Sequence, residues 1–141
     1  MKSLRTLLKL ANRDLETLRR EMAALIERQS ALEHRIAGHD QTIAQEQVLA
    51  QRDYEASRVF GGYAAAAIQR RRAMVSEGAM IAADIERLRA LITAAHVEAR
   101  KFERLIELEE ARAKVKAEQR ESAELDDFAT MRAARARPSA S

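Results

Sequence analysis

The sequence has no cysteine, one proline (Pro138) and few aromatic residues. Without cysteine, a disulfide framework and a thiolate zinc site are both excluded, and a reducing compartment is favoured. No apolar run approaches the roughly 18 to 20 residues of a membrane span, and the N-terminus lacks the apolar core of a signal peptide. We therefore expect a cytoplasmic protein with no cofactor, no metal and no direct membrane insertion.

Alanine, glutamate, arginine and leucine dominate instead, a composition typical of long helices and coiled coils. Large apolar residues recur at intervals of three and four, singly or in adjacent pairs, and form no longer continuous run. Lysines and arginines alternate with acids and leave a net charge of +3. Such interleaving indicates a solvated helix surface rather than a polyanion-binding face.

A first apolar seam alternates steps of four and three residues, as in a heptad repeat. Its members are Leu4, Leu8, Ala11, Leu15, Leu18, Met22, Leu25, Gln29, Leu32, Ile36, His39, Ile43, Glu46, Ala50 and Asp53. Polar residues gather toward its second half, so we expect this end to be the looser one. On this interpretation Asp53→Leu would be neutral or stabilising. His39 is interpreted as a residue of the seam rather than a metal ligand, because no cysteine or i+4 histidine accompanies it.

A second seam with the same spacing begins at Phe60, next to Gly61-Gly62. This glycine pair readily takes turn conformations. The second seam comprises Phe60, Ala64, Ala67, Arg71, Met74, Gly78, Ile81, Ile85, Leu88, Ile92, Ala95, Ala99, Phe102, Ile106, Glu109, Ala113, Lys116 and Arg120. The prediction is an all-α protein, a long antiparallel two-helix coiled-coil hairpin forming a single domain over residues 1–137. Helix 1 is expected at about 3–58, the turn at about 59–63, helix 2 at about 64–135, and a disordered tail at 138–141. A break at Ser76-Glu77-Gly78 is the alternative.

A turn near residue 61 sets the pairing of the two seams within one chain. Leu18 would face Phe102, Leu32 would face Leu88, and Arg71 would offset Glu46. The second helix outlasts the first, so residues past about 117 would have no partner. Leu125, Phe128, Met131 and Arg132 share one face of this overhang, which is therefore a candidate for docking in another protein.

Three of the five aromatic residues, Tyr54, Phe60 and Tyr63, cluster around the expected turn. They either cover the last turn of the hairpin or form an exposed patch for a partner. No catalytic site is visible, because carboxylates on a two-helix surface stay in water with no concave pocket around them.

Several stretches resemble the FliJ family of flagellar export proteins, and the related stalk proteins of type III secretion. They are the opening at residues 4–10, Tyr54, the segment 101–105, and the end at 125–129 followed by Arg132 and Arg135. The resemblance implies an antiparallel coiled coil similar to the central stalk of rotary ATP synthases. It also implies a stalk that binds the hexameric export ATPase ring, promotes its activity and couples it to the membrane export gate. Export chaperones are further possible partners, and the implied location is the inner face of the cell membrane at the flagellar base.

The resemblance assigns two sets of contact residues. Ring-binding residues would be Leu4, Arg5, Leu8, Arg120, Leu125, Asp127, Phe128, Met131, Arg132 and Arg135. Gate-binding residues would be His39, Ile43, Tyr54, Phe60 and Tyr63. Two other hypotheses stay open: a coiled-coil adaptor or dimerisation rod unrelated to secretion, and a nucleic-acid binder using Arg70-Arg71-Arg72 and the arginines of the C-terminal tail. No base-reading motif accompanies those arginines, so no nucleic-acid partner is expected.

Overall fold

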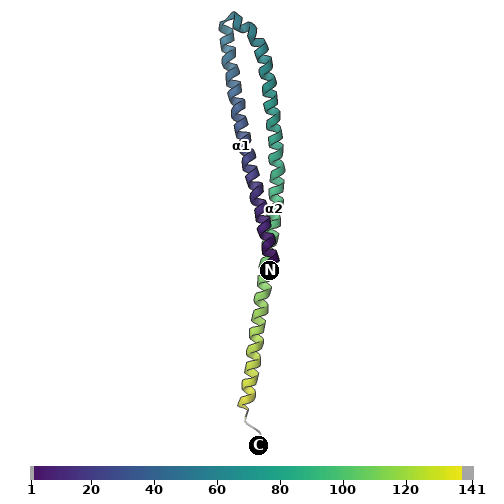
Figure 1. Ribbon diagram of the computed structural model, residues 1–141. Coiled ribbons are helices and arrows are strands. Elements are labelled where there is room, and N and C mark those ends of the chain that lie inside the picture. The colour runs from purple at the N-terminus through teal and green to yellow at the C-terminus, as the bar shows by residue number, and fades with distance from the viewer. Residues whose placement is uncertain (1, 138–141) are drawn as a thin grey trace. The chain divides into compact units, whose positions relative to one another are not determined.

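Two α-helices make up the part of the chain that the computed structural model describes, residues 2–137. Helix α1 (Lys2–Arg52) has 51 residues and helix α2 (Tyr54–Ala136) has 83. They run antiparallel and are joined at Asp53 (Figure 1). The predicted all-α helical hairpin is confirmed, and the expected tail at 138–141 lies outside the described residues.

The turn lies at Asp53, and not at the predicted Gly61-Gly62. The Asp53 carboxylate oxygen Oδ1 accepts a hydrogen bond from the backbone N–H of Glu55 at 3.1 Å, and its carbonyl oxygen accepts one from Ser57 N–H at 3.0 Å. This is the geometry of a helix N-cap, which satisfies donors that the first turn leaves without partners. Asp53, expected as the last residue of the first seam, therefore lies in the turn and caps α2 instead.

Charges on both sides of Asp53 suit this turn. Arg52 lies in the last turn of α1 and Glu55 in the first turn of α2, each of the sign that the helix dipole favours there. Gly61, Gly62 and Gly78 all lie inside α2, and no described residue has a positive φ. Helix α2 is thus continuous through the predicted turn and through the alternative break at residues 76–78.

The predicted seams mark the buried side of both helices. Every buried or half-buried residue that the structure describes in α1 belongs to the first seam, and within that seam only Glu46 and Asp53 are exposed. In α2 the second seam is buried or half-buried from Phe60 to Glu109 except at Arg71, and it is fully exposed at Ala113, Lys116 and Arg120. The heptad spacing therefore predicted the inward-facing side of both helices, and in α2 only Ala56, Tyr63, Asp84 and Glu103 are half-buried outside the seam.

Contacts divide the chain into two units, of which the larger is Arg13–His96. Its core is formed by Leu32, Ile81 and Ile85, with the partly buried Met22, Leu25, Ile36 and Met74 packed around them. A Cβ built on Gly78 would lie 3.4 Å from Leu32 Cδ2, so the small residue lets the two helices approach closely. The core of this unit is a single seam between two helices.

The pairing inside this unit differs from the predicted one. Leu32, expected opposite Leu88, packs against Ile81 and Ile85, roughly one to two helical turns earlier in α2. Arg71, expected near Glu46, pairs with Asp40 instead, at 2.8 Å between Nε and Oδ1. Moving the turn from residue 61 to residue 53 causes both changes. The pairing of Leu18 with Phe102 stays a prediction.

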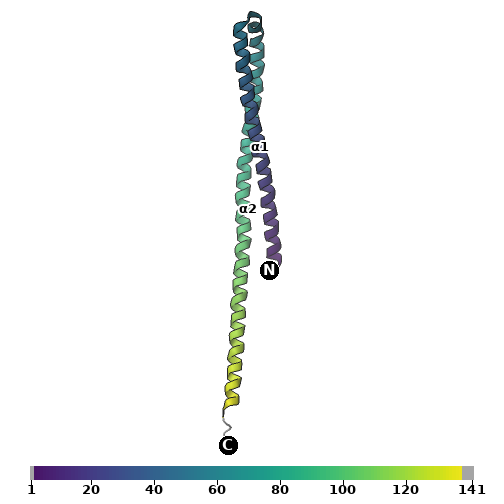
Figure 2. The same cartoon turned by 90° about the vertical axis from the view of Figure 1, so that its left-hand side faces the viewer.

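The other unit contains the first residues of α1 and the end of α2, Met1–Asn12 with Val97–Ser141. Ala11 and Ala99 are buried within it, and Phe102 and Ile106 are half-buried. Arg5 joins the two helices through an ion pair with Glu110, with 3.3 Å between Nη2 and Oε1. Beyond this pair α2 continues past the start of α1 (Figures 1 and 2).

Candidate functional site

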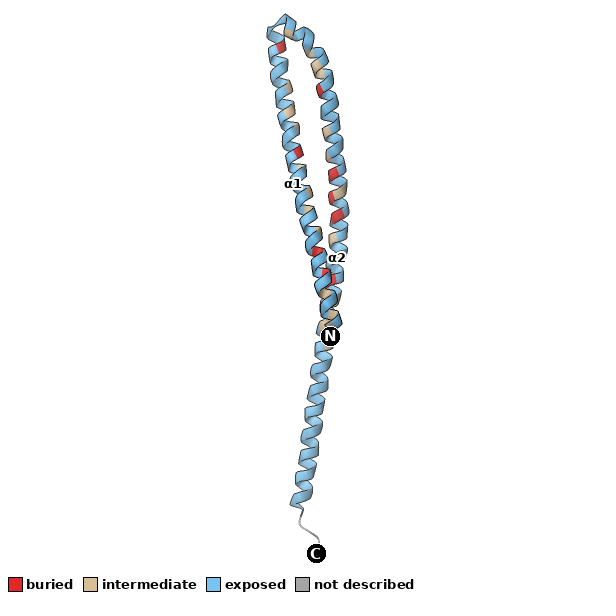
Figure 3. Cartoon of the chain, in the orientation of Figure 1, coloured by how far each residue is buried: buried red, intermediate tan, exposed pale blue. Residues whose placement is uncertain are grey.

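The overhang of α2 carries large apolar side chains that are exposed to solvent. All residues from 110 to 137 are exposed (Figure 3), where the sequence predicted an overhang from about 117. Leu125, Phe128 and Met131 have exposed fractions of 68%, 63% and 58%. Spaced by three residues, they lie on one side of the helix. We call this side, together with Arg132 and Arg135, the terminal face.

The remaining ring-binding candidates are divided between this overhang and α1. Arg120 and Asp127 are exposed and seven residues apart, so they lie together on the flank of the terminal face. Leu4 and Leu8 are half-buried seam residues, and Arg5 is engaged with Glu110. The three α1 candidates thus hold the two helices together, whereas the α2 candidates face solvent.

Sequence reasoning missed a second group of exposed apolar residues in this unit. Leu7, Leu10, Leu105, Leu108 and Val115 have exposed fractions between 37% and 52%. Leu108 and Val115 line a shallow groove of about 650 Å³ with the basic side chains Arg112 and Lys116. The sequence could have indicated these residues, because they are large and apolar and fall outside the heptad seam. They add apolar surface close to where the overhang begins.

The gate-binding candidates lie in the larger unit, three of them around the turn. The rings of Phe60 and Tyr63 are 6.2 Å apart and half-buried, whereas Tyr54 has an exposed fraction of 79%. Phe60 and Tyr63 line a groove of about 450 Å³ that also includes Glu46 and Asp53. Arg70 packs over Tyr63, with its guanidinium carbon 5.9 Å from the ring centre. We call Tyr54, Phe60 and Tyr63 the turn surface.

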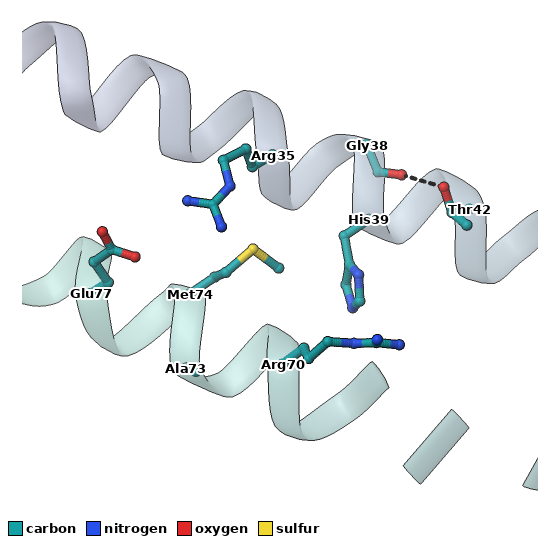
Figure 4. A pocket seen from close by; sticks show the side chains of 8 residues that line it. All are labelled: Arg35, Gly38, His39, Thr42, Arg70, Ala73, Met74 and Glu77. Carbon is teal, nitrogen blue, oxygen red and sulfur yellow. Dashed lines mark hydrogen bonds between the residues drawn. The ribbon is translucent and has the colours of Figure 1, made fainter. Parts of the chain in front are cut away.

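His39 and Ile43 are half-buried in the seam and separate from the turn surface. The Nε2–H group of His39 donates a hydrogen bond to the carbonyl oxygen of Ala67 at 2.9 Å; a carbonyl can only accept, so Nε2 carries the proton. His39 also lines a pocket of about 590 Å³ with Arg35, Arg70, Met74 and Glu77 (Figure 4). This bond ties α1 to α2, as expected for a histidine within a coiled-coil seam.

Among the described residues of the larger unit, one ion pair links α1 to α2, that of Asp40 with Arg71, and it is exposed. The hydrogen bond from Arg71, and to a smaller extent its charge, lower the pKa of Asp40 below its ordinary 3.8. Among the described residues no group of three or more histidine or acidic side chains is arranged to hold a metal ion. Neither described helix has a stretch both long and apolar enough to cross a bilayer.

The fold is thus a helical hairpin in which α2 protrudes and carries exposed apolar surface at its end. The sequence matches one family model, described as flagellar FliJ protein, over residues 1–138. The chain belongs to the flagellar FliJ family. No match was found among curated proteins or among solved structures. Membership of this family makes the protein a component of flagellar protein export, associated with the flagellar export apparatus, rather than an enzyme.

Proposed function

We propose that the terminal face binds the hexameric flagellar export ATPase ring and promotes ATP hydrolysis by it. One observation supports this proposal above the others: Leu125, Phe128 and Met131 share one side of a helix that is exposed over its whole described overhang. Large exposed apolar side chains on one helix face are typical of binding sites for a hydrophobic groove.

The charges around the terminal face suit a ring whose pore carries acidic loops. Arg132 and Arg135 adjoin Phe128, and arginine next to an aromatic residue is a frequent pair at the centre of protein interfaces. A single helix inside a symmetric ring can contact only some subunits at one time. Such a contact favours ATP hydrolysis by one ring subunit after another, as in a rotary ATPase with a central stalk.

We further propose that the turn surface, with His39 and Ile43, binds the cytoplasmic domain of the membrane export gate. The exposed Tyr54 and the groove beside Phe60 and Tyr63 support this assignment. Binding of the ring by one unit and of the gate by the other would couple ATP hydrolysis to export at the inner face of the membrane. We also propose that the protein escorts export chaperones.

Truncation tests the ring assignment. Deleting residues 118–141 leaves the seam intact, because the last half-buried residue of α2 is Glu109. We expect the truncated chain to stay helical by circular dichroism and to lose its stimulation of the purified ATPase. Full stimulation by the truncated chain would exclude the terminal face as the coupling element.

A pair of charge reversals sharpens this test. Phe128→Ala combined with Arg132→Glu should remove most of the stimulation. Phe128→Ala combined with Arg137→Glu has the same net charge, but residue 137 lies on the opposite side of the helix from residue 128. Equal losses in the two variants would show that the side of the helix on which the charge is reversed does not matter, and would contradict the role of Arg132.

The turn surface has its own test. Tyr54→Ala with Phe60→Ala should weaken binding to the gate domain in a pull-down at least tenfold and leave ATPase stimulation unchanged. Unaffected gate binding would contradict the assignment. If neither the ATPase nor the gate binds the parent chain, the protein has another role in flagellar export and both assignments are wrong.

A further inference from the structure

The terminal face has a second property, a symmetry of charge about Phe128. Leu125 and Met131 each lie three residues from Phe128. Glu124 and Arg132 each lie four residues away, one before Phe128 and one after it. At seven residues Glu121 precedes Phe128 and Arg135 follows it. Glu124 and Glu121 thus each have an arginine at the same distance on the other side of Phe128.

These positions share one side of α2. Glu121, Glu124, Phe128, Met131 and Arg135 follow one another in steps of three and four, the spacing of a coiled-coil seam. Leu125 and Arg132 adjoin that line. All seven residues are exposed, and none of the four charged ones has an ion pair among the described residues. The set therefore forms a continuous stripe that lies open along the helix.

Two copies of this stripe are complementary to each other when they run antiparallel. If two copies meet with Phe128 opposite Phe128, a two-fold axis passes between the two rings. Leu125 of each copy then faces Met131 of the other, and Glu124 faces Arg132. Glu121 faces Arg135 in the same arrangement. A two-fold interface uses one patch twice and so needs this self-complementarity.

We propose that two copies of this chain pair antiparallel through residues 119–137 of α2, centred on Phe128. The overhang has room for this pairing. In the antiparallel overlap residue 137 of one copy lies opposite residue 119 of the other. This segment lies beyond Glu110, which pairs with Arg5 of α1, and every residue in it is exposed. The pairing also avoids the parallel alternative, in which each acid would meet the same acid and each arginine the same arginine.

Pairing by so short a helix segment is weak. We expect a dissociation constant on the order of 0.1 mM, weaker than for interfaces of standard size. Paired chains bury Leu125, Phe128 and Met131, so no other partner can bind the same face at the same time. The inference does not depend on the proposed function; where both hold, self-pairing competes with ring binding.

Charge exchange tests the pairing in the full chain. Sedimentation equilibrium at low salt should show a rise from the mass of one chain toward that of two at concentrations around 0.1 mM. Glu121→Arg with Glu124→Arg, and separately Arg132→Glu with Arg135→Glu, should each weaken self-association at least tenfold. An equal mixture of the two variants, and a single chain carrying all four exchanges, should restore it. A parent chain that stays monomeric, or a mixture that fails to restore association, would overturn the proposal.

Disulfide trapping tests the geometry, because the chain has no native cysteine. Phe128→Cys should link to its own copy on mild oxidation, whereas Ala123→Cys, on the opposite side of the helix, should not. Leu125→Cys should link to Met131→Cys in a mixture and only poorly to itself, which also covers the case in which loss of the Phe128 ring weakens pairing. Efficient linking of Leu125→Cys to itself would indicate a parallel pair and overturn the antiparallel assignment.

Discussion

Two segments of α2 carry apolar residues on one side of the helix and differ in their surroundings. Ile81, Ile85 and Leu88 have exposed fractions of 3% to 5%, because α1 packs against them in the larger unit. Leu125, Phe128 and Met131, which lie beyond the ion pair of Glu110 with Arg5 of α1, have exposed fractions of 58% to 68%. The spacing defines an apolar face in both segments, and the presence of a second helix decides whether that face is a core or a binding surface.

The largest expected difference between the two segments is in stability. Leu32→Ala or Ile85→Ala should lower the free energy of unfolding by about 2 to 4 kcal/mol, because each change leaves a cavity in the seam. Phe128→Ala should change it by less than about 0.5 kcal/mol, as for an exposed side chain. Urea denaturation followed by circular dichroism measures both. Equal losses would mean that the overhang is packed in solution.

Glycine replacement distinguishes a helix from a turn at residues 61 and 62. A Cβ added at either position meets nothing within 4 Å, and both residues lie in helix α2. Gly61→Ala with Gly62→Ala should therefore raise the free energy of unfolding by about 1 to 2 kcal/mol through helix propensity. Destabilisation by this double change would return the turn to Gly61-Gly62.

The cap at Asp53 gives a smaller effect of opposite sign. Asp53→Leu removes the acceptor for Glu55 N–H and should lower the free energy of unfolding by about 1 kcal/mol. Asp53→Asn, which keeps a side-chain oxygen, is the matched control and should change it little. A stabilising Asp53→Leu would indicate that residue 53 lies in a seam after all.

The smallest effect concerns the pair of Asp40 and Arg71. The pKa of Asp40 is lower in the folded chain than its ordinary 3.8, so the pair stabilises the fold above that pH. This contribution is lost as the pH falls through the folded-state pKa. Asp40→Asn should therefore be slightly less stable than the parent at pH 7, and the difference should disappear in acid, once the pH is below the lowered pKa of Asp40. A difference that persists in acid would mean that Asp40 acts through packing and not through charge.

The candidate binding residues fall into two groups. Some could be predicted from their spacing in the sequence, and for others the packing of the two helices decides whether they are exposed. Leu125, Phe128 and Met131 could be selected from their spacing and from the length of α2. Leu4 and Leu8 were selected with them, yet they lie in the seam, because apolar residues near a terminus have the same spacing whether or not a second helix covers them. Leu7 and Leu10 were missed since they do not belong to the repeat.

The sequence by itself determined the all-α class and the inward-facing side of each helix, because the heptad period is a local property that every turn of helix repeats. Only the tertiary structure decided where the chain reverses and which layers meet. Gly61-Gly62 and Asp53 both permit a turn, and each seam offers an apolar residue every three or four positions in either register. The choice between them depends on how well whole layers pack, such as Leu32 against Gly78 and Ile81, and on the cap that Asp53 forms.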